Sequence, residues 1–278
     1  SSVTQINMIF DTVIASFLIT GSIGWLYMSD RFVELPLALF GISIATVMLP
    51  KLSDYFNRSN IDAYNRTLNW GLKLGILISF PTMLGLIILS DPILITLLKY
   101  KEFTLNDVHM TSIALIAFSI GLPGMIGSKI LITNYYSRKD TKYPVKAALI
   151  AVLCNFVLNI AFVVYLVKTD FNGAHIGLAV ATSLSAYVNF FFLFKNAVKT
   201  KIFNMDQDII FYILKSVIAT IVMSAFLLYF DLSKQAWMDY ELVERVMNLF
   251  LLIIFSALIY FAFLYLFNIK PKNIKEQL

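Results

Sequence analysis

Apolar stretches long enough to cross a bilayer recur along the whole chain of 278 residues, and they limit the folds open to it. A helix needs about 20 apolar residues to cross the hydrocarbon core of a membrane. Residues 35–50 carry no charge, and apolar residues make up 59% of the chain against 14% charged ones. A soluble domain averages about a quarter charged residues. The sequence therefore predicts an all-α integral membrane protein.

The apolar pattern predicts about eight transmembrane helices, with bounds good to a few residues. The polar stretch 200–208 is the best candidate for a boundary inside the chain. We therefore expect a six-helix unit over residues 1–200 and a two-helix hairpin over residues 201–278. The predicted spans cover residues 3–20, 22–49, 67–89, 108–134, 143–167, 175–197, 208–230 and 243–268.

Basic residues are distributed unevenly between the predicted connections. If the first span starts in the cytoplasm, the connections on that side hold 13 Lys and Arg, and those on the opposite side hold five together with eight acids. Cytoplasmic loops of membrane proteins carry such an excess of Lys and Arg. We therefore predict that both ends of this chain are cytoplasmic. The net charge of +5 then reflects topology and not nucleic-acid binding, although anionic membrane lipids can still interact with these residues.

The sequence offers no catalytic motif. The lone Cys154 excludes an intrachain disulfide, and the two histidines lie far apart in the sequence. A Ser-His-Asp set, a glycine-rich phosphate loop and a zinc motif are all missing. We predict that the protein is not an enzyme. Because the first ten residues already read as membrane helix, without an initiator Met, we also expect the chain to be a piece of a longer protein.

Three charges lie together near the start of the second predicted span. Asp30, Arg31 and Glu34 share one helical face. A charge at the centre of a membrane helix costs about 2.5–3.5 kcal/mol on insertion scales, so charges kept there often have a function. The planar guanidinium of Arg31 suits phosphate oxygens, and Lys129 is a second candidate for binding substrate. The alternatives are a salt-bridged cluster that only fixes helix packing, and a Lys129 side chain that extends to the headgroups.

Oxygen-bearing side chains form a second candidate site. Asp11 is the only charged residue among the first 29, and it lies in the middle of a predicted span. Asn155 and Asn159 share a face of the fifth span, and Thr182 follows Leu178 by one turn on the sixth. Hard cations prefer oxygen ligands, which these side chains and the Leu178 carbonyl could supply. Alternatively, Asp11 is protonated or hydrogen-bonded to a neighbour and only holds helices together.

Three stretches of the sequence resemble one family, the MurJ (MviN) lipid II flippases. They are residues 21–53 (GSIGWLYMSDRFVELPLALFGISIATVMLPKLS), 63–74 (AYNRTLNWGLKL) and the block 103–146. The family belongs to a superfamily of multidrug, oligosaccharidyl-lipid and polysaccharide exporters with two six-helix lobes, and its members add two helices. The resemblance implies that this chain is the second lobe plus the extra pair, and that the first lobe is absent from it.

The resemblance implies a function in peptidoglycan biosynthesis, as part of a flippase in the bacterial inner membrane. The flippase would move undecaprenyl-pyrophosphate-linked lipid II to the outer leaflet by alternating access, and we expect it to act as a monomer. Arg31 would be the cavity arginine, oriented by Asp30 and Glu34, and the last two helices would form a groove for the lipid tail. Some family members bind sodium at positions that match Asp11, Asn155, Asn159, Leu178 and Thr182. The open alternatives are a cation-coupled exporter of the same superfamily and a non-transporting scaffold for cell-wall synthesis.

Overall fold

The computed structural model describes residues 2–200, 203–230 and 232–269, and within these ranges the chain is helical and contains no strand. Side chains are described from residue 5 onward. The helices, in chain order, are α1 (Ser2–Ser16), α2 (Ser22–Pro36), the π-helix η1 (Leu37–Ile42), α3 (Ser43–Asn57), α4 (Ile61–Ile88), α5 (Ser90–Leu98), α6 (Leu105–Ile120), α7 (Leu122–Tyr136), α8 (Lys142–Lys168), α9 (Ile176–Lys199), α10 (Ile209–Leu228), α11 (Lys234–Asp239) and α12 (Leu242–Leu266).

The predicted all-α membrane fold is confirmed, with six or seven helices able to span a bilayer in the described part of the chain. Six are long and apolar enough alone: the continuous run Ser22–Asn57 and the helices α4, α8, α9, α10 and α12. The seventh is the pair α6 and α7, which meet at 43°. The difference from the eight expected spans lies in α1, which has 15 residues and falls short of the usual spanning length.

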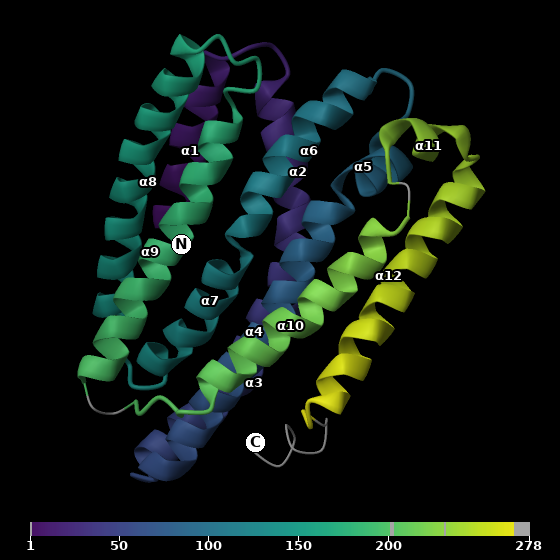
Figure 1. Ribbon diagram of the computed structural model, residues 1–278. Helices are drawn as coiled ribbons and strands as arrows, with labels where there is room; N and C mark the ends of the chain where they lie inside the picture. The colour runs from purple at the N-terminus through teal and green to yellow at the C-terminus, as the bar shows by residue number, and fades with distance from the viewer. Residues whose placement is uncertain (1, 201–202, 231, 270–278) are drawn as a thin grey trace.

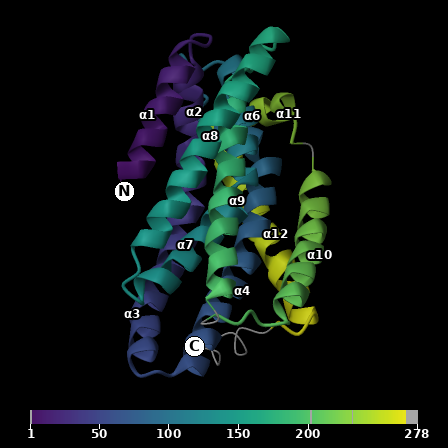
Figure 2. The same cartoon turned by 90° about the vertical axis from the view of Figure 1, so that its left-hand side faces the viewer.

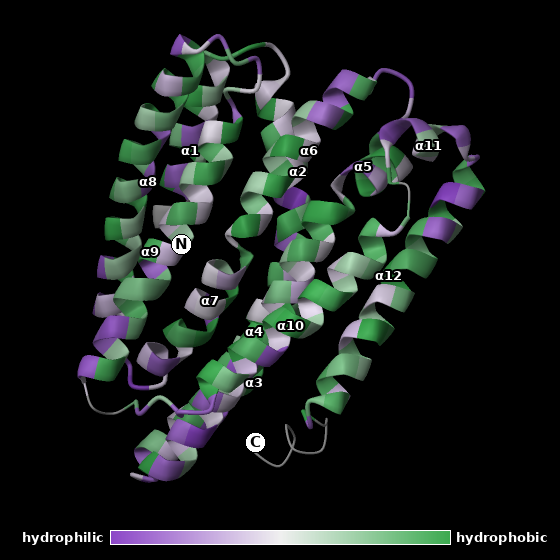
Figure 3. Cartoon of the chain, viewed as in Figure 1, coloured by the Kyte–Doolittle hydropathy of each residue, from purple (hydrophilic) through white to green (hydrophobic). Residues whose placement is uncertain are grey.

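One predicted polar connection is helical instead. Residues 51–66 were expected to link two spans, but α3 continues to Asn57 and α4 already begins at Ile61. The Asn60 side chain accepts a hydrogen bond from the backbone N–H of Ala63, which caps α4. Hydrophilic residues gather on these extended ends of α3 and α4 in Figure 3. The two spans are therefore longer than hydropathy indicated.

The helices form two neighbouring groups around α4. On one side α8 lies against α9, and α1 packs on α8; on the other side α10 packs against α4 and α12 (Figure 1). The rotated view in Figure 2 shows α8 and α9 in front of the central helices, with α10 and α12 beyond them. The short helix α11 connects α10 to α12, and its Trp237 donates a hydrogen bond to Thr96 of α5 at 2.9 Å.

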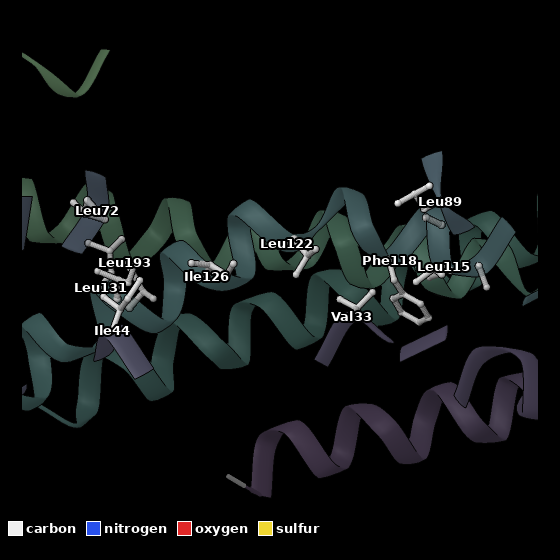
Figure 4. Packing of buried hydrophobic residues seen from close by; sticks show 14 of the residues in the cluster. Val33, Ile44, Leu72, Leu89, Leu115, Phe118, Leu122, Ile126, Leu131 and Leu193 are labelled. Carbon is white, nitrogen blue, oxygen red and sulfur yellow. The ribbon is translucent and has the colours of Figure 1, made fainter. Parts of the chain in front are cut away.

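A continuous apolar core joins the central helices. Most of its buried side chains come from α2, α3, α4, α6, α7 and α9, and Figure 4 shows several of them at close range. A smaller cluster connects α4 with the last two long helices through Leu77, Ala219, Met223, Tyr260 and Leu264. The C-terminal pair is therefore attached to α4 by apolar contacts.

Two helix irregularities are stabilised by hydroxyl groups from neighbouring helices. Pro81 has no N–H for the carbonyl of Leu77, four residues earlier in α4, and the Tyr260 hydroxyl of α12 donates to that carbonyl at 2.6 Å. At the α6–α7 bend, the Ser183 hydroxyl of α9 lies 2.6 Å from the Ala117 carbonyl. A Cβ on Gly121 would lie 2.8 Å from the Ser183 Cα, so only glycine permits this close approach.

Candidate functional site

The charged cluster of α2 lies opposite the face that packs on the bundle. The packed face of α2 is tied to α6: the Trp25 indole N–H donates to Asp107 at 2.8 Å, and the Ser29 hydroxyl lies 2.8 Å from the Thr111 carbonyl. Helical periodicity then turns Arg31 away from α6. This anchoring explains why Arg31 remains accessible although its helix contributes to the core.

Arg31 has two partners, and both come from its own helix. Its guanidinium forms an ion pair with Glu34 at 2.5 Å, and the two side chains are 49% and 46% exposed. The guanidinium carbon also lies 4.7 Å from the centre of the Tyr27 ring. The structure therefore brings Arg31 and Glu34 together as the helical spacing predicted, and it adds Tyr27, which the sequence reasoning did not single out.

Asp30 occupies a different environment from its two charged neighbours. It is half-buried and makes no hydrogen bond or ion pair with any described residue. Its carboxylate interacts electrostatically with Glu34 and Arg31, and also with Asp11 of α1. Asp30 therefore interacts electrostatically with residues of both candidate sites. Its negative charge favours a cation near Asp11.

Lys129 lies apart from any counter-ion. It is exposed on α7, and none of the described residues forms an ion pair or hydrogen bond with it. Its neighbours Ile126 and Ile130 are fully buried and pack toward glycines of η1 and α4. Lys129 is therefore an accessible cation on a helix whose other faces are packed.

The oxygen-bearing residues form one hydrogen-bonded chain across three helices. The Asn159 amide donates to Asp11 of α1 at 2.6 Å and to Asn155 at 2.9 Å. The Asn155 amide in turn donates to the Thr182 hydroxyl of α9 at 3.2 Å, and Asn7 donates to Asp11 at 3.2 Å. Four of the five predicted residues are thus in direct contact.

Leu178, the fifth residue, is buried on α9 one turn before Thr182. Its backbone carbonyl was the expected ligand, and it lies on the same stretch of α9 as the Thr182 hydroxyl. No side-chain hydrogen bond among the described residues links Leu178 to the other four, and within the continuous helix α9 its carbonyl is positioned to accept the backbone N–H of Thr182.

These hydrogen-bonded residues fit a monovalent cation if the side-chain amide of Asn159 is rotated by 180°. The Asn159 side-chain oxygen is buried and has no hydrogen-bond donor, while its NH₂ group lies between the oxygens of Asp11 and Asn155. A 180° rotation of this amide would replace the donor with an oxygen, so that three oxygens would face one another. Hard cations take such oxygen ligands. Within the described residues no group of three or more His, Cys, Asp or Glu could hold a metal, so a transition-metal site has no support there.

A buried ion pair outside both predicted sites was missed from the sequence. The Lys73 ammonium of α4 lies 2.7 Å from Asp206 in the connection before α10, and its side chain is only 6% exposed. Asn69 of α4 holds the same connection through hydrogen bonds with the backbone of Asn204 and Asp206. The signal that could have revealed this contact is that Lys73 is the only charge in the predicted span 67–89.

Comparisons with known proteins agree on one family. The family described as "Lipid II flippase MurJ" matches residues 1–248. A relative from Vibrio cholerae serotype O1, "Probable lipid II flippase MurJ", is 38% identical over 99% of this chain and 51% of its own length. The chain thus spans about half the length of the curated relatives that it matches.

Solved structures extend the agreement to the fold. A structure of "Lipid II flippase MurJ, inward closed conformation" matches 95% of this chain and 51% of its own, with a TM-score of 0.75 and 31% identity. An outward-facing multidrug transporter of the MATE family covers 81% of this chain at a TM-score of 0.58, and at 16% identity that likeness concerns the fold alone. The chain therefore belongs to the MurJ lipid II flippase family.

Proposed function

We propose that the protein containing this chain moves lipid II, an undecaprenyl-pyrophosphate-linked precursor of peptidoglycan, from the inner to the outer leaflet of the bacterial cytoplasmic membrane. It acts as a transporter, without chemical conversion of the substrate. Membership of the MurJ family supports this function. The observation that carries it is Arg31, a half-exposed guanidinium on a helix run that is otherwise long and apolar enough to span a bilayer. A charge in that position has a functional role by default.

The chemistry of the cluster suits a pyrophosphate headgroup. A guanidinium presents its N–H donors in a planar fork that matches phosphate oxygens. Without an anionic ligand, Glu34 accepts a hydrogen bond from the Nη1 group of Arg31. A bound headgroup would take the place of the Glu34 carboxylate, and the accessible Lys129 would provide a second positive charge for the substrate.

The proposed architecture follows the family pattern. Residues 1–200 act as the second six-helix lobe of a two-lobe transporter, and residues 201–278 add the two helices that accommodate the lipid tail. Both ends of this chain lie in the cytoplasm, and the protein acts as a monomer by alternating access between this lobe and a first lobe. Of this region, residues 201–202, 231 and 270–278 lie outside the part of the chain that the structure describes.

Sodium is the proposed coupling ion for this lobe. Asp11 supplies the single negative charge, and Asn155, Asn159, Thr182 and the Leu178 carbonyl supply neutral oxygens. One formal charge balances one monovalent ion. The hydrogen-bonded contacts between α1, α8 and α9 support this assignment because they already gather the ligand groups.

A transport assay tests the function. The complete encoded protein that contains this chain is reconstituted into liposomes with fluorescent lipid II, and the fraction of label accessible from outside is followed over time. Because a hydrogen bond to a charged group contributes about 1.5–3 kcal/mol, Arg31→Ala is expected to slow translocation by at least about tenfold. Arg31→Lys should retain part of the activity because it keeps the charge and loses the fork.

Arg58→Ala provides the matched control. Arg58 forms an ion pair with Asp54 at 2.9 Å near the polar end of α3, with its side chain 74% exposed, and its loss should leave translocation unchanged. In cells, depletion of the protein should cause lysis and accumulation of lipid II in the inner leaflet. Normal transport and full complementation by Arg31→Ala would reject the carrier role and favour a scaffold.

A further inference from the structure

The face of α2 that carries Arg31 includes an exposed aromatic residue, Tyr27. Tyr27 lies one turn before Arg31, is 53% exposed, and has no hydrogen bond to another described helix. Its ring centre lies 4.7 Å from the Arg31 guanidinium carbon. Cations within about 6 Å of a ring centre are attracted by its π-electrons. The contact therefore acts on Arg31 alone.

Among the described residues, three other cations contact the ring of a residue close in sequence, as Arg31 does (Lys101, Arg138 and Lys195), whereas Lys73 is also anchored in a different part of the chain. Lys73, 4.9 Å from the Tyr212 ring, also pairs with Asp206. For Arg31 both partners belong to α2, so neither contact ties the side chain to a second helix. Among the described residues, Arg31 has a cation–π contact with Tyr27 and an ion pair with Glu34, while Asp30 acts on it only electrostatically.

The ring and the carboxylate hold different parts of the guanidinium. The Tyr27 ring centre lies 4.7 Å from the guanidinium carbon, whereas Glu34 accepts a hydrogen bond from the Nη1 group. An anionic phosphate also needs the in-plane donors. A ligand can therefore displace Glu34 while the ring contact persists, and the guanidinium does not have to follow the departing carboxylate.

The helix surface beside Tyr27 is open. A Cβ on Gly24, two turns before Arg31, would meet no atom within 4 Å. Residues seven apart lie on the same face of a helix, so this open surface adjoins the Arg31 cluster. The packing of the described chain does not require a glycine here, and the helix surface at Gly24 is uncovered.

From this arrangement we propose that Tyr27 is a positioning residue for the anionic headgroup of the substrate. Its ring holds the Arg31 guanidinium toward the open face of α2 when phosphate oxygens replace Glu34. The proposal rests on the function proposed above, since it assigns Tyr27 a role at the same site. It predicts that the aromatic ring, and not the hydroxyl, is required.

Binding of undecaprenyl pyrophosphate to the complete encoded protein in nanodiscs provides the test. Tyr27→Leu is expected to weaken binding about three- to tenfold, while Tyr27→Phe, which keeps the ring, stays within about twofold of the unchanged protein. In the transport assay, Tyr27→Leu should raise the half-saturating lipid concentration more than it lowers the maximal rate. Tyr165→Leu is the matched control, because Tyr165 is 65% exposed on α8, away from this cluster.

A structural role and a positioning role give different results. If Tyr27 positions Arg31, its substitution should have little further effect in an Arg31→Ala background, and the thermal unfolding midpoint of the ligand-free protein should not change. Unaltered binding by Tyr27→Leu, failure of Tyr27→Phe to restore binding, or an equal effect of Tyr27→Leu in the Arg31→Ala background would each overturn the proposal. If Arg31→Ala itself binds the lipid normally, the proposed function of Arg31 fails first. If only Tyr27→Leu is without effect, the function stands and this inference alone is wrong.

Discussion

Single side chains determine whether the polar cluster at α1, α8 and α9 only holds these helices together or also binds an ion. In the described arrangement an amide donor of Asn159 lies between two oxygens, and its own oxygen has no donor. Such a group is costly to bury unless something satisfies it. A cation that meets the rotated Asn159 oxygen would remove this cost. The orphaned oxygen is therefore the structural reason to expect a ligand here.

Asp11→Asn should abolish the sodium response. A ligand that binds only the folded state stabilises it by RT ln(1 + [L]/Kd), or about 2.7 kcal/mol when its concentration is 100 times Kd. We expect NaCl, compared with KCl at the same ionic strength, to raise the thermal unfolding midpoint of the unchanged protein and to have no specific effect on Asp11→Asn. Asp62→Asn, on the exposed start of α4, is the control. The same sodium effect in Asp11→Asn would remove this carboxylate from the site.

Asn159 allows a gain-of-function test at the same place. Asn159 contacts Asp11, so one added negative charge at this position should strengthen cation binding. Asn159→Asp is therefore expected to shift the sodium response to lower concentrations, in contrast to Asp11→Asn.

At the scale of helices, a proline removes a backbone N–H donor, and a neighbouring helix can supply a donor in its place. Pro36 precedes the π-helix η1, and Pro123 lies in the first turn of α7 after the bend. In α4 the helix continues through Pro81, and the carbonyl that the proline leaves without a donor receives the Tyr260 hydroxyl. A long-range hydrogen bond thus satisfies a carbonyl that has no donor within α4, and it attaches α12 to α4.

Tyr260→Phe should destabilise the attachment of α12. The substitution leaves the Leu77 carbonyl without its donor, which costs about 1–3 kcal/mol for a buried group. Tyr260 is 2% exposed, so water does not readily replace the lost hydrogen bond. The expected result is a lower thermal unfolding midpoint in detergent and faster hydrogen exchange along α12. Tyr229→Phe, with Tyr229 86% exposed, should change neither; equal stability of both variants would show that the hydroxyl of Tyr260 does not contribute.

At the scale of the whole molecule, the connection between α9 and α10 is fixed to α4 by polar contacts. Asn65, Asn69 and Lys73 succeed one another by one turn along α4, and each binds the segment around Asn204 and Asp206. This ladder joins the C-terminal helices to the central bundle at one end, and the Tyr260 cluster joins them further along. The C-terminal pair should therefore move together with α4 during any conformational change.

Asp206→Asn should loosen this connection. Lys73 is buried, and breaking a buried ion pair by removing one partner costs about 3–5 kcal/mol, with less expected here because Asp206 is 43% exposed. We expect faster proteolysis within residues 200–208 and faster hydrogen exchange at the start of α10. Asp208→Asn lies two residues away, is exposed and caps no N–H, so it is the matched control. Equal cleavage of the two variants would exclude a structural role for the Lys73–Asp206 pair.

Features set by short-range spacing were accessible from the sequence. The spans followed from hydropathy because a bilayer requires long apolar helices. Arg31 and Glu34 were expected on one face because three residues make nearly one helical turn, and they do form an ion pair. Tyr27 lies four residues before Arg31, so the same helical spacing brings its ring beside the guanidinium. Asp11, Asn155, Asn159 and Thr182 were grouped by their oxygen ligands and by the family resemblance, since hydropathy alone does not pair helices.

Tertiary structure alone decided which distant groups meet. Lys73 and Asp206 are 133 residues apart, and Tyr260 and Leu77 are 183 apart. Hydropathy reports how a residue partitions into lipid, but it contains no information on which helix faces which. The helical extensions at Asn57 and Ile61 and the 43° bend of α6 and α7 likewise depend on packing against neighbours. The amino-acid sequence thus determined the membrane class and the local charge cluster. The packing of helices determined the Lys73–Asp206 ion pair, the Tyr260 hydrogen bond next to Pro81 and the contacts of Asp11.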